Sequence, residues 1–87
     1  MTEKEIKEMA IRLAEEKNFK ITKEDRGLYK LETETEIIEV ATTTFAKATV
    51  CINRFTKEGN FRIPTGHQLV NIGCKEATAL RKIAKVI

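Results

Sequence analysis

Cys51, His67 and Cys74 are the side chains that could act as nucleophile, base or soft metal ligand. Their spacing matches no Cys-x-x-Cys or His-x-x-His pair of the kind that holds zinc. The chain has no Ser, and its only Asp is Asp25. Most sets of nucleophile, base and acid therefore cannot be assembled. We expect no catalytic residue, no metal and no cofactor, and we interpret both cysteines as reduced thiols used as small apolar residues.

Cys74 lies at the start of the last predicted helix, beside Lys75. A helix N-terminus favours a thiolate, so Cys74 is the thiol to test for reactivity. The run Gly73-Cys74-Lys75 is superficially similar to a phosphate-binding loop. The Walker pattern needs Gly-Lys-Ser/Thr after a buried parallel strand, which excludes a nucleotide-hydrolysing site. Free amides at the helix start and Lys75 could still hold a backbone phosphate.

Charge is distributed unevenly along the chain. The net charge of +3 combines 11 acidic and 8 basic residues over 1–44 with 2 acidic and 8 basic residues over 45–87. Such asymmetry points to a polyanionic partner. The predicted nucleic-acid contact comprises the basic residues of the second half: Lys47, Arg54, Lys57, Arg62, Lys75, Arg81, Lys82 and Lys85. Alternatively, the acidic first half and the basic second half lie side by side and neutralise each other's charge within the molecule.

A row of carboxylates offers a second hypothesis. Glu32, Glu34 and Glu36 alternate along one predicted strand and would share a face. Most simply, this is a solvated strand face. It could also mimic phosphates, in which case the chain is a small inhibitor or adaptor that binds a larger protein, such as a nucleic-acid-processing enzyme.

The first half of the chain contains a helix and a hairpin. Thr2 and Glu5 form a capping-box pattern, and apolar residues recur at helical spacing, so we predict a helix over about residues 3–17 that ends near Asn18. The turn at 24–27 has Gly27 suited to the position after a type I turn. The next strand alternates over 29–36.

Further strands and a second helix complete the predicted fold. The pair Ile37-Ile38 breaks the alternation and predicts a bulge or bend, strands follow to about residue 63, and Pro64-Thr65-Gly66 closes the sheet. A helix from about residue 75 has Ala77, Leu80, Ile83, Ala84 and Ile87 on its apolar side and the lysines and arginine on the other. We predict one domain over 1–87, an α+β two-layer sandwich in the order α-β-β-β(-β)-α, with both helices on one face of an antiparallel meander.

This layout resembles the double-stranded RNA-binding domain, an α-β-β-β-α module whose second helix begins with lysines that face phosphates. The run Lys75-Glu76-Ala77, with Ala84 further on, carries the resemblance. The turn Asp25-Arg26-Gly27 replaces the family's Gly-Pro-x-His, and Cys74-Lys75 replaces its paired lysines. The stretch between the helices is also about ten residues longer than in the family, so the resemblance is one of architecture and implies backbone contact with little base readout.

The remaining expectations concern location and assembly. The charged start Met1–Glu8 lacks the apolar core of a secretory signal, and apolar runs are far too short to span a bilayer. We therefore expect a cytoplasmic protein without membrane contact. Ile11, Ile38 and Val86 lie off the predicted apolar faces, and with an exposed strand edge they suggest a homodimer contact.

Overall fold

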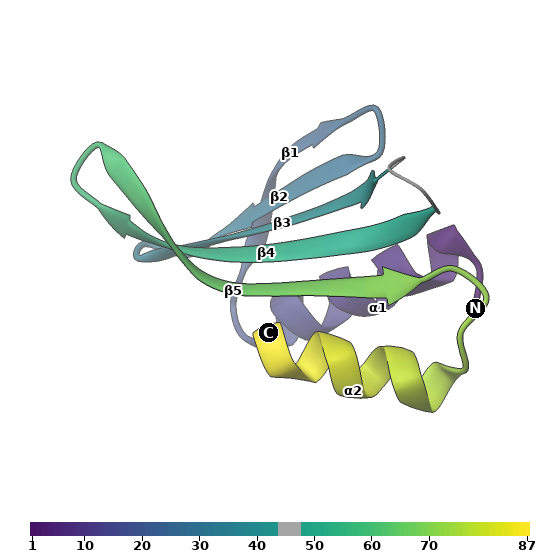
Figure 1. Cartoon of the computed structure of the whole chain (residues 1–87). Helices are drawn as coiled ribbons and strands as arrows, with labels where there is room; N and C mark the ends of the chain where they lie inside the picture. The colour runs from purple at the N-terminus through teal and green to yellow at the C-terminus, as the bar shows by residue number, and fades with distance from the viewer. Residues whose placement is uncertain (44–47) are drawn as a thin grey trace.

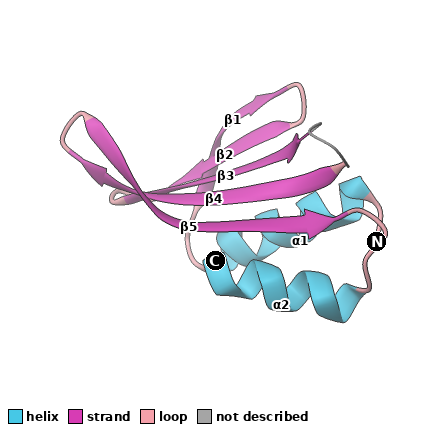
Figure 2. Cartoon of the chain, in the orientation of Figure 1, coloured by secondary structure: helices cyan, strands magenta, loops and turns pink. Residues whose placement is uncertain are grey.

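Two helices and five strands make up the part of the chain that the computed structural model describes, residues 1–43 and 48–87 (Figure 1). The strands form a single antiparallel sheet in the order β1-β2-β3-β4-β5, and both helices lie on one of its faces (Figure 2). The predicted α+β meander is therefore confirmed. The elements in chain order are α1 (Glu3–Glu16), β1 (Lys20–Asp25), β2 (Leu28–Glu32), β3 (Glu36–Thr43), β4 (Thr49–Glu58), β5 (Phe61–Asn71) and α2 (Glu76–Val86).

The core lies between the helix layer and one face of the sheet. Alternate residues of β2 to β5 point toward the helices because successive side chains of a strand point to opposite faces. Burying each of these aliphatic side chains contributes about 1.5–3 kcal/mol. The core residues are Ile6, Met9, Ala10 and Ala14 of α1, Ala79, Ile83 and Val86 of α2, and Leu31, Ile38, Val40, Val50, Ile52 and Val70 of the sheet, together with Phe19 and Ile87.

Helix α1 begins as its sequence predicts. The Thr2 hydroxyl accepts a hydrogen bond from Glu5 N at 3.2 Å, and Thr2 N donates to Glu5 Oε1 at 2.8 Å, which completes the capping box. The helix ends at Glu16, and Asn18 takes a left-handed conformation with φ of 70°.

The turn between β1 and β2 differs from the predicted type. Asp25 pairs with Leu28, so the turn holds the two residues Arg26 and Gly27. Both have positive φ, 51° and 84°, which is the type I′ geometry that fits the twist of a two-residue hairpin. The predicted left-handed conformation of Gly27 is confirmed, but the predicted type I turn before it was wrong, because Arg26 also has positive φ.

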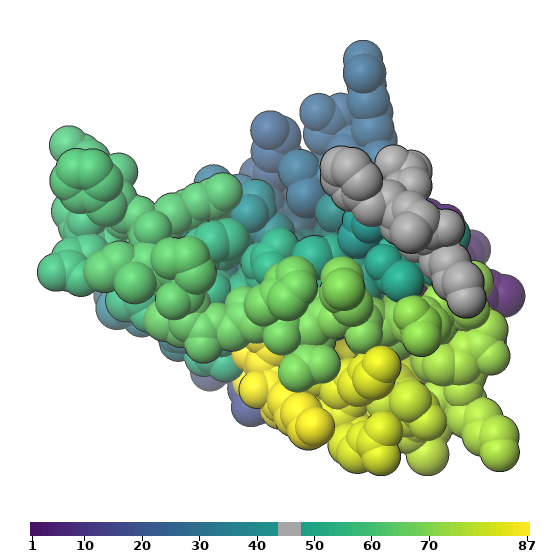
Figure 3. Space-filling model, in the orientation of Figure 1, coloured from purple at the N-terminus to yellow at the C-terminus, as the bar shows by residue number. Residues whose placement is uncertain are grey.

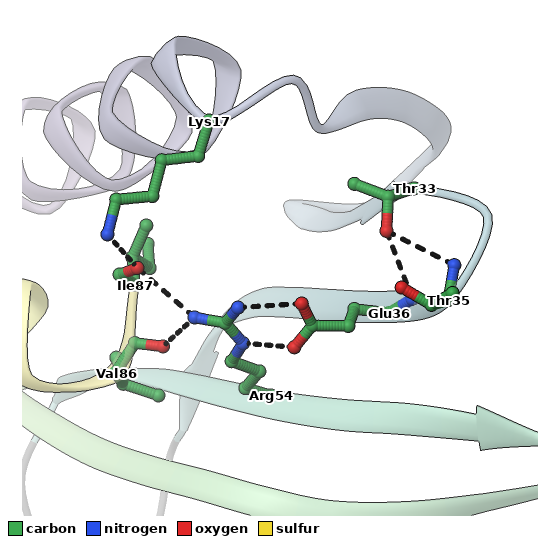
Figure 4. A network of polar contacts seen from close by, with 7 residues as sticks. All are labelled: Lys17, Thr33, Thr35, Glu36, Arg54, Val86 and Ile87. Atoms are coloured by element: carbon green, nitrogen blue, oxygen red, sulfur yellow. Dashed lines mark hydrogen bonds and ion pairs between the residues drawn. The ribbon is translucent and has the colours of Figure 1, made fainter.

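The boundary between β2 and β3 also differs. Strand β2 ends at Glu32, and the chain turns at 33–35, where the Thr33 hydroxyl accepts hydrogen bonds from the amides of Thr35 at 3.3 Å and Glu36 at 3.0 Å (Figure 4). Ile37 and Ile38 are both buried although they lie on opposite faces of β3, and both pair regularly with β2 and β4. The predicted bulge at this pair was therefore wrong.

Strand β5 continues through the predicted loop after Pro64. The register shifts between Arg54 and Phe55, opposite Pro64–Gly66, and the pairing then runs on to Asn71. A Cβ atom at Gly66 would lie 2.8 Å from a methyl group of Val86. The glycine therefore lets α2 pack closely against β5.

The buried side of α2 is rotated from the predicted one. Ala79, Ile83 and Val86 are buried, whereas Leu80 is 45% exposed and Ala77 and Ala84 face solvent. Two of the suggested dimer residues, Ile38 and Val86, belong to the core, and Ile11 packs against it. Neither helix of the described residues has the length and apolar character that crossing a membrane requires.

Candidate nucleic-acid interface

Helix α2 carries a row of cationic side chains away from the core. Lys75, Arg81 and Lys85 are exposed, and Lys82 is half-buried with its Nζ donating to Leu69 O at 3.4 Å. Within residues 1–43 and 48–87, none of these four cations forms an ion pair. In the space-filling view, α2 (yellow) lies directly beside β5 (green), so the two share one surface (Figure 3).

Arg54 has a structural role that differs from the predicted nucleic-acid contact. Its Nε and Nη2 donate to the two carboxylate oxygens of Glu36 at 2.6 and 2.8 Å. Its Nη1 donates to the main-chain oxygens of Val86 and Ile87, each at 3.1 Å, and Lys17 Nζ reaches the Ile87 oxygen at 2.6 Å (Figure 4). The arginine thus joins β3, β4 and the end of α2, so it is not free to contact phosphate.

The ion pair of Arg54 and Glu36 also favours the charged form of both side chains. Hydrogen bonds from the guanidinium lower the pKa of Glu36 from its ordinary value, and the carboxylate raises the pKa of Arg54. The guanidinium carbon lies 5.6 Å from the centroid of the Phe19 ring, close enough for a cation–π contact.

Lys57 and Arg62 are engaged on the other face of the sheet, which the helices leave uncovered and which we call the open face. Lys57 Nζ lies 2.9 Å from Glu32 Oε1 and 2.9 Å from Thr33 O. Arg62 Nη1 lies 3.0 Å from Glu39 Oε1, and its guanidinium is stacked 4.3 Å above the Phe55 ring. Two more cations of the predicted set are therefore compensated within the molecule.

Lys47, the remaining member of the predicted set, lies outside the described residues. Of the eight cations predicted to contact nucleic acid, the four at α2 therefore form no ion pair among the described residues. The three on the β4–β5 hairpin each form an ion pair with a glutamate.

The predicted acidic row is broken by the turn at 33–35. Glu32 ends β2 on the open face, where hydrogen bonds from Thr22 and then from Lys57 lower its pKa. Glu34 is exposed in the turn, and Glu36 begins β3 with its carboxylate on Arg54. The prediction that the three share one strand face was wrong.

The structure brings together a cluster that the sequence did not identify. Cys51 and Asn53 of β4 and His67 of β5 meet on the open face, with Cys51 Sγ 3.8 Å from His67 Nδ1. The alternation of β4 places residues 51 and 53 on one face, but the prediction ended the next strand near residue 63. With the strand ending there, His67 was not expected to lie beside Cys51 and Asn53.

Cys74 is not part of that cluster. Its side chain is half-buried and packs against the core, and its carbonyl accepts a hydrogen bond from the Met1 amino group. No group of three His, Cys, Asp or Glu side chains within the described ranges is placed to hold a metal ion.

Comparison with protein-family models, with curated proteins and with solved structures finds no match for the chain.

Proposed function

We propose that this protein is a non-catalytic binding module that contacts the backbone of duplex nucleic acid through α2. The observation that carries the proposal is the set of four cationic side chains on one helix, Lys75, Arg81, Lys82 and Lys85, which form no ion pair within the described residues. Each phosphate that a cation neutralises releases counterions, so such a row gives affinity without base readout.

The spacing of these cations suits a nucleic-acid strand. Lys75 and Lys85 are ten residues apart, which is about 15 Å along a helix. One strand of a duplex carries about four phosphates over that length. The four cations therefore extend over a length of α2 that corresponds to several phosphates of a duplex.

The start of α2 supports the same proposal. Lys75 occupies the N-cap position, and its side chain makes no capping hydrogen bond to the first amides. A lysine at this position meets the positive end of the helix dipole, which is unfavourable, and the carboxylate of Glu76 in the first turn offsets this only in part. A backbone phosphate would accept hydrogen bonds from the free amides and pair with the ammonium group.

The hairpin contributes less to this proposal than its charge suggests, because Arg54, Lys57 and Arg62 are held by Glu36, Glu32 and Glu39. The same ion pairs weaken the alternative of a protein contact through the acidic row. Glu32 and Glu36 form ion pairs within the molecule, and Glu34 lies exposed in the turn at 33–35.

Fluorescence anisotropy with short DNA and RNA duplexes over a range of salt concentrations tests the proposal. The double variant Arg81→Gln/Lys85→Gln should weaken binding and reduce the slope of log K against log salt by about 1.8, since each lost contact contributes about 0.9. Lys20→Gln/Lys23→Gln is the matched control because it removes the same charge from exposed positions on β1.

Absence of binding at low salt would refute the proposal. An equal loss in both double variants would also refute it, because the affinity would then follow net charge rather than the surface of α2.

A further inference from the structure

The cluster on the open face joins a thiol, an amide and an imidazole from adjacent strands. Asn53 and His67 are register partners, and Cys51 lies two residues before Asn53 on the same face of β4. Asn53 Nδ2 lies 3.4 Å from Cys51 Sγ, and Asn53 Oδ1 lies 2.6 Å from His67 Nδ1. The same imidazole nitrogen lies 3.8 Å from the sulfur.

The two ends of the Asn53 amide have different partners, the sulfur of Cys51 and the imidazole of His67. The NH₂ group donates to the sulfur, which is the arrangement that stabilises a thiolate. The carbonyl oxygen accepts from Nδ1 when that nitrogen carries a proton. Asn53 therefore holds the imidazole beside the sulfur, where the ring nitrogen is placed to take the thiol proton.

Cys51 lies on the face of the sheet that the helices leave uncovered. Cys51 is half-buried and His67 is exposed, and both helices cover the other face of the sheet (Figure 2). The register partners of Cys51 are Ala41 on β3 and Leu69 on β5, neither of which is charged. Glu39, the β3 partner of Asn53, is paired with Arg62.

We propose that Cys51 is a thiol–disulfide exchange site that forms a mixed disulfide with a small disulfide compound. The Cys51 thiol gives its proton to His67 Nδ1, which is free to accept it when the ring proton is on Nε2, and the new Nδ1–H donates to Asn53 Oδ1 while the thiolate attacks one sulfur of the disulfide. A bond forms between Cys51 Sγ and that sulfur while the original S–S bond breaks. The other sulfur leaves as a thiolate and takes the proton from His67, so no further oxidant is needed. One molecule of disulfide is consumed per chain, which makes this a modification site.

Cys74 provides an internal control. The only imidazole of the chain lies against Cys51, and Cys74 packs against the core instead. Trypsin separates the two thiols, because Cys51 falls in the peptide 48–54 and Cys74 in the peptide 63–75. Mass spectrometry can therefore follow each thiol in the same sample.

The test exposes the native protein to oxidised glutathione for increasing times, stops the exchange with acid, and measures the mixed disulfide on each peptide. Cys51 should react at least about tenfold faster than Cys74. In urea-unfolded protein the two rates should become similar. Equal rates in the native protein, or a faster Cys74, would overturn the proposal.

Two variants assign the role of the neighbours. His67→Gln keeps a polar side chain but cannot take the proton, and it should slow Cys51 about tenfold while Cys74 is unchanged. Asn53→Ala should slow Cys51 as well, since it removes the amide donor. A structural effect would alter the Cys74 rate and the melting curve too. If both variants fold and leave the Cys51 rate unchanged, the cluster does not activate the thiol.

Discussion

Arg54 is a side chain on which several elements depend at once. It binds both oxygens of Glu36 and the last main-chain oxygens around α2, and it is largely shielded from solvent, with 25% of the side chain exposed. Replacing it removes charge-assisted hydrogen bonds and leaves Glu36 without its partner. Arg54→Met should therefore lower the free energy of unfolding by about 2 kcal/mol, as measured by urea denaturation.

A surface pair supplies the control for this experiment. The side chain of Lys4 is 85% exposed, and its Nζ lies 3.9 Å from Glu8. Lys4→Met should change stability by less than about 0.5 kcal/mol. A similar small effect for Arg54→Met would show that Arg54 does not hold β3, β4 and α2 together.

The sequence did contain a signal for the role of Arg54. Val50, Ile52 and Arg54 alternate along one face of β4, so the arginine lies on the buried side and not among the solvent-facing cations. Its partner could not be predicted, because Glu36 was assigned to the wrong strand. The Cys51 cluster was hidden for a related reason, since its geometry depends on a strand pairing.

At the scale of elements, the bounds of the helices were predicted well, whereas the buried side of α2 and the strand boundaries were not. A helix is specified by caps and by apolar spacing within one segment, as Thr2 and Glu5 illustrate. The turn at 33–35 has no Gly or Pro and continues the alternation of Thr and Glu, so the sequence predicts a strand there. Its geometry comes from the Thr33 hydroxyl, which bonds the amides that follow.

Lys75 is the position where α2 departs from the rules of helix stability. Ser at the N-cap would accept a hydrogen bond from a free amide, so Lys75→Ser should raise the free energy of unfolding by about 0.5–1 kcal/mol. The same substitution should weaken duplex binding, because it removes a phosphate contact. Urea denaturation and fluorescence anisotropy on the same samples measure both effects.

A substitution at the N-cap of α1 is the control for the stability measurement. Thr2→Ala removes an existing cap and should lower stability by about 1 kcal/mol without affecting binding. If Lys75→Ser gains stability and keeps full affinity, then Lys75 does not take part in the interface.

At the scale of the whole molecule, the opposed charges of the two halves meet largely in the sheet. Glu32, Glu36 and Glu39 come from the acidic half and pair with Lys57, Arg54 and Arg62 of the basic half. Charge counts along the sequence predicted the asymmetry but not this pairing, which depends on the register of β2, β3 and β4. Within the described residues, the cations of the basic half that form no ion pair are therefore those of α2 and its N-cap, Lys75, Arg81, Lys82 and Lys85.

This pairing makes stability dependent on pH. Hydrogen bonds from Arg54, Thr22 and Thr42 are the main causes that hold the pKa of Glu36, Glu32 and Glu3 below the usual value of 4.5. The unfolded chain then binds more protons than the folded one over this range, so stability rises with pH. The contribution is present above about pH 5 and is lost as the pH falls through the lowered pKa values.

The urea midpoint should therefore decrease steadily between about pH 5 and pH 3. Glu36→Gln should be less stable than the native protein at neutral pH and should show a flatter decrease in acid, because one of the responsible carboxylates is gone. Glu34→Gln removes an exposed carboxylate that forms no ion pair within the described residues, so its profile should follow that of the native protein. Parallel profiles for Glu36→Gln and the native protein would mean that the link between β3, β4 and α2 does not depend on the ionised carboxylate.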